Sequence, residues 1–162
     1  MCKQSAGILA FRSTGLTEVL LVHPGGPFYK NKDLGVWSVP KGEHEIHEDS
    51  LAVAKKEFQE ETGNIISSES FIKLEPVKNK SGKTLTTWAV EADFDPCYIA
   101  SNTFELEWPP KSGIIKLFPE CDTAEWFTLD VAITKLYPYQ QPLIEQLRII
   151  NTKEDKYAGR IF

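Results

Sequence analysis

Apolar and polar positions follow strand-like and helix-like periods along the chain, which divides it into short strands and amphipathic helices. Apolar runs at 5–12 and 18–23 flank a Ser-Thr-Gly turn and predict a β-hairpin of central strands. Further strands are expected at 36–42, 70–77, 84–94, 104–108 and 123–127. Helices are expected at 50–62, 129–136 and 142–150. We therefore expect one α/β domain over residues 1–150, followed by a polar C-terminal tail at 151–162.

The helix expected at 50–62 has clear ends and one apolar face. Asp49 or Ser50 precedes it as the N-cap, and Gly63 follows it as a left-handed C-terminal residue. An apolar stripe runs along it at i, i+3 and i+7, formed by Leu51, Ala54 and Phe58. This stripe must face a hydrophobic core.

Three carboxylates lie on the helix face beside that stripe. At about 100° per residue, Glu57, Glu60 and Glu61 share one ridge. Their like charges at i, i+3 and i+4 cost about 0.2–0.5 kcal/mol per pair. One interpretation is a solvated acidic face, which is what most charge runs are. The other is a site for Mg²⁺ or Mn²⁺, because the ridge borders the core and the turn at 40–42 brings backbone carbonyls near the helix start.

The spacing around this helix resembles the Nudix box, which reads glycine, five residues, Glu, seven residues, Arg-Glu-apolar-x-Glu-Glu-x-Gly-apolar. The matching positions are Gly42, Glu48, Lys56, Glu57, Phe58, Glu60, Glu61 and Gly63. Several fixed spacings match together, so the signal is more specific than a short motif. Lys56 replaces the usual Arg and Asn64 replaces the usual apolar residue. Because lysine lacks the bidentate fork of arginine, a salt bridge from Lys56 is expected to be looser.

The resemblance implies a Nudix-like α/β/α sandwich with a mixed β-sheet and a bound divalent cation, Mg²⁺ or Mn²⁺. It assigns the metal to Glu57, Glu60 and Glu61 with the backbone carbonyl of Gly42. It also makes Glu120 a catalytic candidate, because a loop glutamate five residues before Glu125 corresponds to one that reaches the metal in several Nudix enzymes. Either Glu57 or Glu120 is then the base that deprotonates the attacking water. Glu48 and Lys56 are expected to orient the metal-binding carboxylates.

Candidate substrate contacts flank the box. The segment WSVPKG at 37–42 resembles the W-x-x-P-K-G entry of Nudix enzymes that act on dinucleoside polyphosphates, which implies that Lys41 contacts a phosphate rather than only solvent. Tyr29 lies in a loop with aromatic and basic residues, so it either stacks on a base or anchors a surface loop. Trp88 has the same two alternatives, a base contact or a position in the core.

Two further segments, 101–110 and 118–127, resemble a bacterial Nudix subgroup of predicted nucleoside-triphosphate pyrophosphohydrolases. The resemblance implies a hydrolase that cleaves a diphosphate bridge in a nucleoside diphosphate linked to another group. Diadenosine polyphosphates lead among the expected substrates, and damaged nucleoside triphosphates follow. Two other classes stay open, a catalytically silent nucleotide sensor and an RNA 5′-end pyrophosphohydrolase.

Net charge and composition limit which classes of partner we expect for this chain. A net charge of −5 argues against nonspecific nucleic-acid binding. Cys2, Cys97 and Cys121 are odd in number and widely spaced, which is typical of a reduced cytoplasmic protein rather than of a disulfide framework. His44 and His47 have no further Cys or His partner, so we expect them at the surface or substrate edge and not on a metal. No apolar stretch approaches the roughly 18 residues of a membrane span, so no membrane partner is expected, and a homodimer is an open alternative to a monomer.

Overall fold

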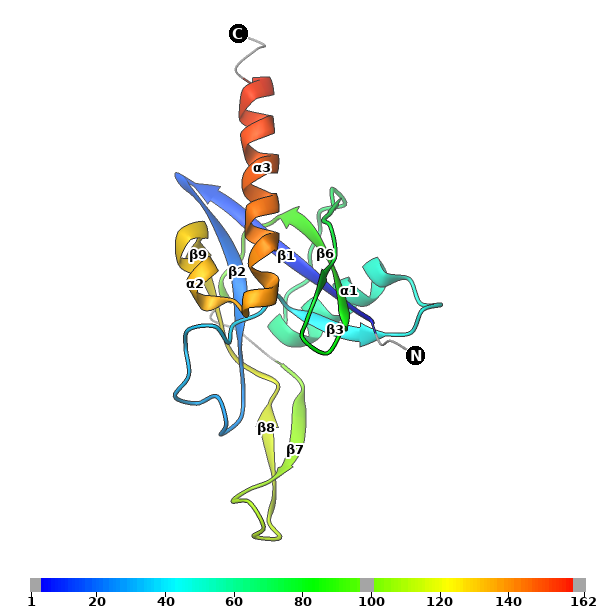
Figure 1. Cartoon of the computed structure of the whole chain (residues 1–162), viewed down its shortest axis with the longest axis vertical. Coiled ribbons are helices and arrows are strands. Elements are labelled where there is room, and N and C mark those ends of the chain that lie inside the picture. The colour runs from blue at the N-terminus through cyan, green and yellow to red at the C-terminus, as the bar shows by residue number, and fades with distance from the viewer. Residues whose placement is uncertain (1–3, 97–100, 159–162) are drawn as a thin grey trace.

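The computed structural model of the protein describes residues 4–96 and 101–158, with side chains as far as residue 151 (Figure 1). The strands are β1 (Gln4–Thr14), β2 (Leu16–Pro24), β3 (Lys41–His44), β4 (Ile72–Lys73), β5 (Val77–Lys78), β6 (Thr84–Glu91), β7 (Thr103–Glu107), β8 (Ile115–Pro119) and β9 (Cys121–Thr128). The helices are α1 (Ser50–Thr62), α2 (Leu129–Lys135), α3 (Gln141–Ala158) and the short 3-10 helix η2 (Pro138–Gln140).

The main sheet is mixed, as the sequence predicts. Its strand order is β4-β6-β1-β2-β9, with β3 also paired to β1 and β5 to β6. The central pair β1 and β6 runs parallel, and the other pairs run antiparallel. The predicted hairpin of β1 and β2 is confirmed, and it turns at Gly15, whose φ of +106° strongly favours glycine.

Two hydrophobic cores lie on opposite faces of this sheet. Alternate residues of β1 face each core, because side chains alternate along a strand. Ala6 and Ile8 pack with Phe58 of α1, whereas Leu9 packs with residues of α2 and α3, including Leu143. The molecule is therefore an α/β/α sandwich, which confirms the predicted fold class.

Helix α1 begins and ends where the sequence predicts. The Asp49 carboxylate accepts a hydrogen bond from the Leu51 amide at 3.1 Å, and Gly63 ends the helix with a φ of +74°. Ala54 and Phe58 are fully buried, so the predicted apolar stripe faces a core. These caps and this stripe fix the rotation of α1 about its axis, and hence the direction of its acidic ridge.

Two predicted strands need correction. Of the segment expected at 36–42, only its end belongs to β3, while Trp37 and Ser38 form isolated bridges with Leu136 and Val22. The strand expected at 70–77 is split into β4 and β5, which lie either side of Pro76, a residue with no N–H for a strand ladder.

Strand β8 was not predicted. It pairs with β7 in a separate two-stranded ribbon that projects from one end of the molecule in Figure 1. Ile115 and Leu117 of β8 remain exposed, so the strand lacks the clear separation of a buried and a solvated face that marks a strand in sequence.

The last helix is longer than predicted. It was expected to end at Ile150, but α3 continues to Ala158, into the residues assigned to a tail. Residues 159–162 lie outside the described chain, as do Cys2 and Cys97. Across the described residues, no helix combines the length and apolar character needed to cross a membrane.

We predict that Phe58→Ala lowers the free energy of unfolding by about 3–5 kcal/mol, because it leaves a cavity in the core. The Phe58 ring now packs edge-to-face against Phe94, with 5.6 Å between the ring centroids. Denaturant unfolding measures the change. The control Ile65→Ala removes a side chain that is 75% exposed and should change stability by less than about 0.5 kcal/mol. Equal losses in both variants would contradict a core position for Phe58.

Candidate active site

Strand β3 lies against the C-terminal half of α1. The Lys41 amide donates a hydrogen bond to Glu61 Oε2 at 3.2 Å. At Gly42, an added Cβ would come within 2.1 Å of Glu57 Cδ, so only a glycine lets the strand approach this closely. The sequence places the entry turn near the start of the helix, and the structure corrects this, because β3 contacts Glu57 and Glu61, which lie about two and three turns further on.

Four carboxylates lie close enough to influence one another. Burial, and then the charges of Glu60 and Glu120, raise the pKa of Glu57. Burial also raises the pKa of Glu61 to about 8, against the opposing effects of the Lys41 charge and amide. Glu57 and Glu120 add to the rise at Glu61. The structure thus brings Glu120, some sixty residues away in sequence, to the acidic ridge of α1.

A cleft of about 130 Å³ opens beside these carboxylates. Its walls include Lys41, Glu61, Glu120, Cys121 and Tyr137. Burial raises the pKa of the Cys121 thiol, and the nearby charges of Glu61 and Glu120 raise it further. The thiol is therefore uncharged at neutral pH and acts as a hydrogen-bonding neighbour of Glu61 rather than as a nucleophile.

Tyr29 reaches the rim of this cleft through Tyr137. Burial, and then a side-chain hydrogen bond with Tyr29, raise the pKa of Tyr137 to about 12. The Lys32 ammonium lies 5.6 Å from the centroid of the Tyr29 ring. The loop that borders the cleft therefore carries both an ammonium group, on Lys32, and an aromatic ring, on Tyr29.

The structure does not bring every predicted residue to the site. Trp88 is 8% exposed and packs in the α1-side core, so the core alternative holds for this residue. The Lys56 side chain is 72% exposed and forms an ion pair with Glu60 at 3.8 Å. Glu48 accepts a hydrogen bond from the Glu45 amide at 2.9 Å and so caps a loop turn. Lys56 therefore contacts one of the predicted metal-binding carboxylates, Glu60, whereas Glu48 bonds within its own loop turn.

His44 also departs from expectation. It was expected at the surface or the substrate edge, but its side chain is buried at the end of β3. Its Nδ1 bonds to the Glu45 carbonyl at 2.8 Å, and its Nε2 has no hydrogen-bond partner among the described residues. His47 is exposed, as expected.

Sequence reasoning missed Tyr137 and Gln140. Gln140 is fully buried and accepts a hydrogen bond from the Val39 amide at 3.0 Å, while its amide donates to Ser38 Oγ at 2.9 Å. It therefore fixes the segment that enters β3. The signal was the Tyr-Pro-Tyr-Gln run between two predicted helices, where polar and aromatic residues gather in a connection.

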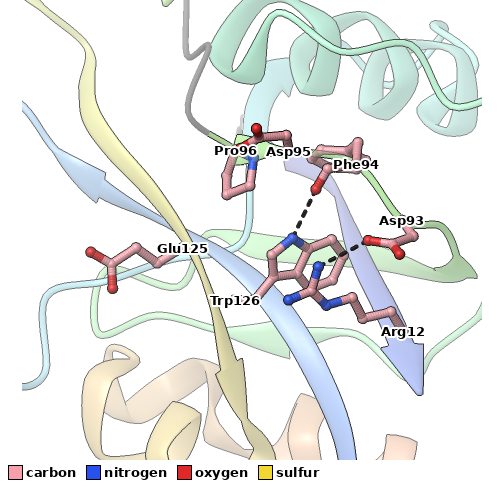
Figure 2. A pocket seen from close by; sticks show the side chains of 7 residues that line it. All are labelled: Arg12, Asp93, Phe94, Asp95, Pro96, Glu125 and Trp126. Carbon is pink, nitrogen blue, oxygen red and sulfur yellow. Dashed lines mark hydrogen bonds and ion pairs between the residues drawn. The ribbon is translucent and has the colours of Figure 1, made fainter. Parts of the chain in front are cut away.

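A larger cavity of about 660 Å³ lies elsewhere (Figure 2). Arg12 lines it, but its guanidinium already bonds Glu18 at 3.0 Å and Asp93 at 2.9 Å and lies 4.4 Å from the Trp126 ring centroid. None of the four carboxylates that interact at α1 lines this cavity. Size alone therefore does not locate the reaction, and the smaller cleft is the candidate site.

The donor set at α1 fits a hard divalent cation, since it offers several carboxylate oxygens. Burial, and then the charges of neighbouring carboxylates, raise the pKa values of Glu57 and Glu61. In the side-chain positions described, no three His, Cys, Asp or Glu side chains converge closely enough to hold a metal ion. Glu57, Glu60 and Glu120 are at least partly exposed, so rotamer changes at these residues can direct their oxygens to one ion.

Residues 2–147 match the family model described as NUDIX domain. The chain belongs to the Nudix family. As a Nudix protein that carries the box carboxylates, it is a pyrophosphohydrolase. No curated protein matches the chain in sequence.

Solved structures of Nudix proteins share this fold. The binary complex of C. elegans Ap4A hydrolase has a TM-score of 0.61 at 20% identity, covering 93% of this chain and 99% of that chain. The NUDIX domain of Shewanella oneidensis NrtR complexed with ADP ribose has a TM-score of 0.62 at 18% identity, covering 91% of this chain and 87% of that chain. The M. smegmatis Nudix hydrolase RenU has a TM-score of 0.56 at 20% identity, covering 93% of this chain and 86% of that chain. At these identities the likeness concerns the fold.

We predict that Gly42→Ala displaces the Glu57 side chain and abolishes stabilisation by Mg²⁺, because the new Cβ takes the space of the carboxyl group. The carboxyl end is flexible, so the metal-free fold should lose less than about 1.5 kcal/mol. Melting temperatures with and without Mg²⁺ measure both effects. In a Glu57→Gln background, Gly42→Ala should cause little further loss of the stabilisation by Mg²⁺. If the losses from the two substitutions added in full, this would contradict an effect of Gly42→Ala through Glu57.

We predict that Glu61→Gln stabilises the metal-free protein at pH 8. The folded-state pKa of Glu61, about 8, lies above its ordinary value of 4.5, so the folded state binds the proton more tightly. Stability is then lost as pH rises from 4.5 to 8, and glutamine removes that loss. Each kcal/mol recovered should raise the melting temperature by about 2–4 °C.

Melting scans in chelator at pH 5 and pH 8 measure this difference, which should be small at pH 5. Glu69→Gln, at an exposed position after α1, is the matched control and should show no such pH dependence. A variant less stable than the unsubstituted protein at pH 8 would count against a costly charge at Glu61.

Proposed function

We propose that this Nudix protein hydrolyses a diphosphate bridge in a nucleoside diphosphate linked to another group, with dinucleoside polyphosphates first and nucleoside triphosphates second among its substrates. The observation that carries the proposal is the meeting of Glu61, Glu120 and Lys41 at one cleft. A diphosphate bridge needs cations against its oxygens and an activated water. The site offers a lysine for the first need and carboxylates for the second.

The metal ligands proposed are Glu57, Glu60 and Glu61 with the Gly42 carbonyl. Bound there, Mg²⁺ or Mn²⁺ neutralises the bridging phosphates and activates a water. Glu57 or Glu120 accepts the proton of that water, since both face the acidic ridge and the charge of Glu120 already acts on Glu57. Lys41 holds a phosphoryl oxygen at the cleft wall, and its amide keeps the Glu61 carboxylate in place.

The proposed substrate preference rests on the entry segment and on the rim of the cleft. The WSVPKG segment resembles the entry of dinucleoside polyphosphate hydrolases, and Lys41 of that segment lines the cleft. Tyr29 provides an aromatic face close to Tyr137, which suits stacking on a base. The structural neighbour from C. elegans is an Ap4A hydrolase, so diadenosine tetraphosphate is the first substrate to test.

We predict that the purified protein with Mg²⁺ cleaves diadenosine tetraphosphate at a diphosphate bridge, and that Glu57→Gln lowers kcat/KM by about 10³-fold. Product analysis should include nucleoside triphosphates, ADP-ribose and triphosphorylated RNA as competing substrates. Glu125→Gln, an exposed carboxylate on β9 outside the acidic ridge, is the control and should retain activity. Binding of one ligand with no turnover would support a nucleotide sensor in place of an enzyme. Cleavage of triphosphorylated RNA alone would support an RNA 5′-end pyrophosphohydrolase.

A further inference from the structure

His23, near the end of β2, has polar contacts that the proposed reaction does not use. Its side chain is 7% exposed and lies edge-to-face against Trp37, with 5.1 Å between the ring centroids. Its chain neighbours Val22 and Pro24 line the cleft, but the His23 ring does not. The ring therefore lies just behind the cleft, where it can act only through other residues.

Both ring nitrogens of His23 face oxygen atoms. Nδ1 lies 2.9 Å from Asp122 Oδ1, and Nε2 lies 2.6 Å from the backbone carbonyl oxygen of Lys32. A backbone carbonyl and an ionised carboxylate can only accept hydrogen bonds. Each ring nitrogen of His23 thus lies within hydrogen-bond distance of an accepting oxygen, and the two oxygens belong to different segments.

Charged groups of three elements lie near the ring. Asp122 lies on β9, Asp33 follows Lys32 in the loop, and Lys135 of α2 pairs with Asp33. Hydrogen bonds from Lys135 and Trp37 lower the pKa of Asp33. The loop is therefore also held to α2 beside the ring.

The ring joins two segments that carry residues of the proposed site. The loop at 25–35 begins at Gly25, whose amide donates to the Glu120 carbonyl at 2.9 Å. Tyr29 lies in the same loop and bonds Tyr137 at the cleft. Through Lys32 the His23 ring holds the later part of this loop, and through Asp122 it holds the strand that follows Glu120.

We propose that His23 is a positioning residue whose ring fastens the Tyr29 loop to the start of β9 and so holds both walls of the cleft. The inference rests on the proposed function for its effect on substrate. Without the ring, the contacts with the Lys32 carbonyl and with Asp122 are lost and the loop loosens. Substrate binding then weakens while the carboxylate ridge of α1 stays intact.

The positioning role is tested by His23→Gln, with Asp122→Asn as a milder second variant that keeps the acceptor and removes its charge. Amide exchange at Gly25 and Lys32 should become about 10-fold faster, the effect of losing a hydrogen bond to a charged group. KM for diadenosine tetraphosphate should rise about 10-fold with a smaller change in kcat. Glu125→Gln, on the same strand, should change neither quantity.

The outcomes separate the two proposals. No turnover by the unsubstituted protein would reject the proposed function, while amide exchange would still decide the role of His23. Turnover with unchanged KM and unchanged exchange in both variants would reject the positioning role and leave the proposed function standing.

Discussion

Crowding of negative charge between α1 and β3 is the constraint on which the site depends. Glu57 and Glu61 are partly buried against a strand that approaches closely because Gly42 has no side chain. Burial raises the pKa of both groups, so the folded protein keeps them close at a cost. Such an arrangement is stable when a cation neutralises it, which is the physical reason to regard the ridge as a metal site rather than as a solvated face.

The opposite layer of the sandwich holds the entry segment in place. Gln140, between α2 and α3, bonds Val39 and Ser38, and Leu136 forms a bridge with Trp37. The segment that leads into β3 is therefore fixed from the side of the sheet that faces away from α1. Because Lys41 follows this segment directly, the C-terminal layer sets the position of the lysine proposed to hold phosphate.

The fold and the site carry different information. Nudix structures with the same sandwich include an Ap4A hydrolase and a NUDIX domain complexed with ADP ribose, so the architecture by itself does not select a ligand. In this chain the loop with Tyr29 and the connection with Tyr137 lie outside the residues that match the Nudix box. Both border the cleft, and both are held by buried polar contacts rather than by the sheet.

Local geometry was readable from the sequence. The caps Asp49 and Gly63 and the spacing of Glu57, Glu60 and Glu61 follow from helix periodicity, so the sequence by itself determined the helix, its buried stripe and its acidic ridge. Hydrophobic pattern also determined the hairpin of β1 and β2 and the α/β class.

The resemblance named Glu120, but tertiary structure alone decided which other distant residues lie around the cleft. Tyr137 lines the cleft and the pair His23–Asp122 lies behind it, whereas Trp88 enters a core because β6 lies beneath α1. No local period encodes such contacts, since they depend on strand order and on loops packed over the sheet. The carboxylates proposed to bind the metal thus lie on one helix, and the fold sets the shape of the cleft.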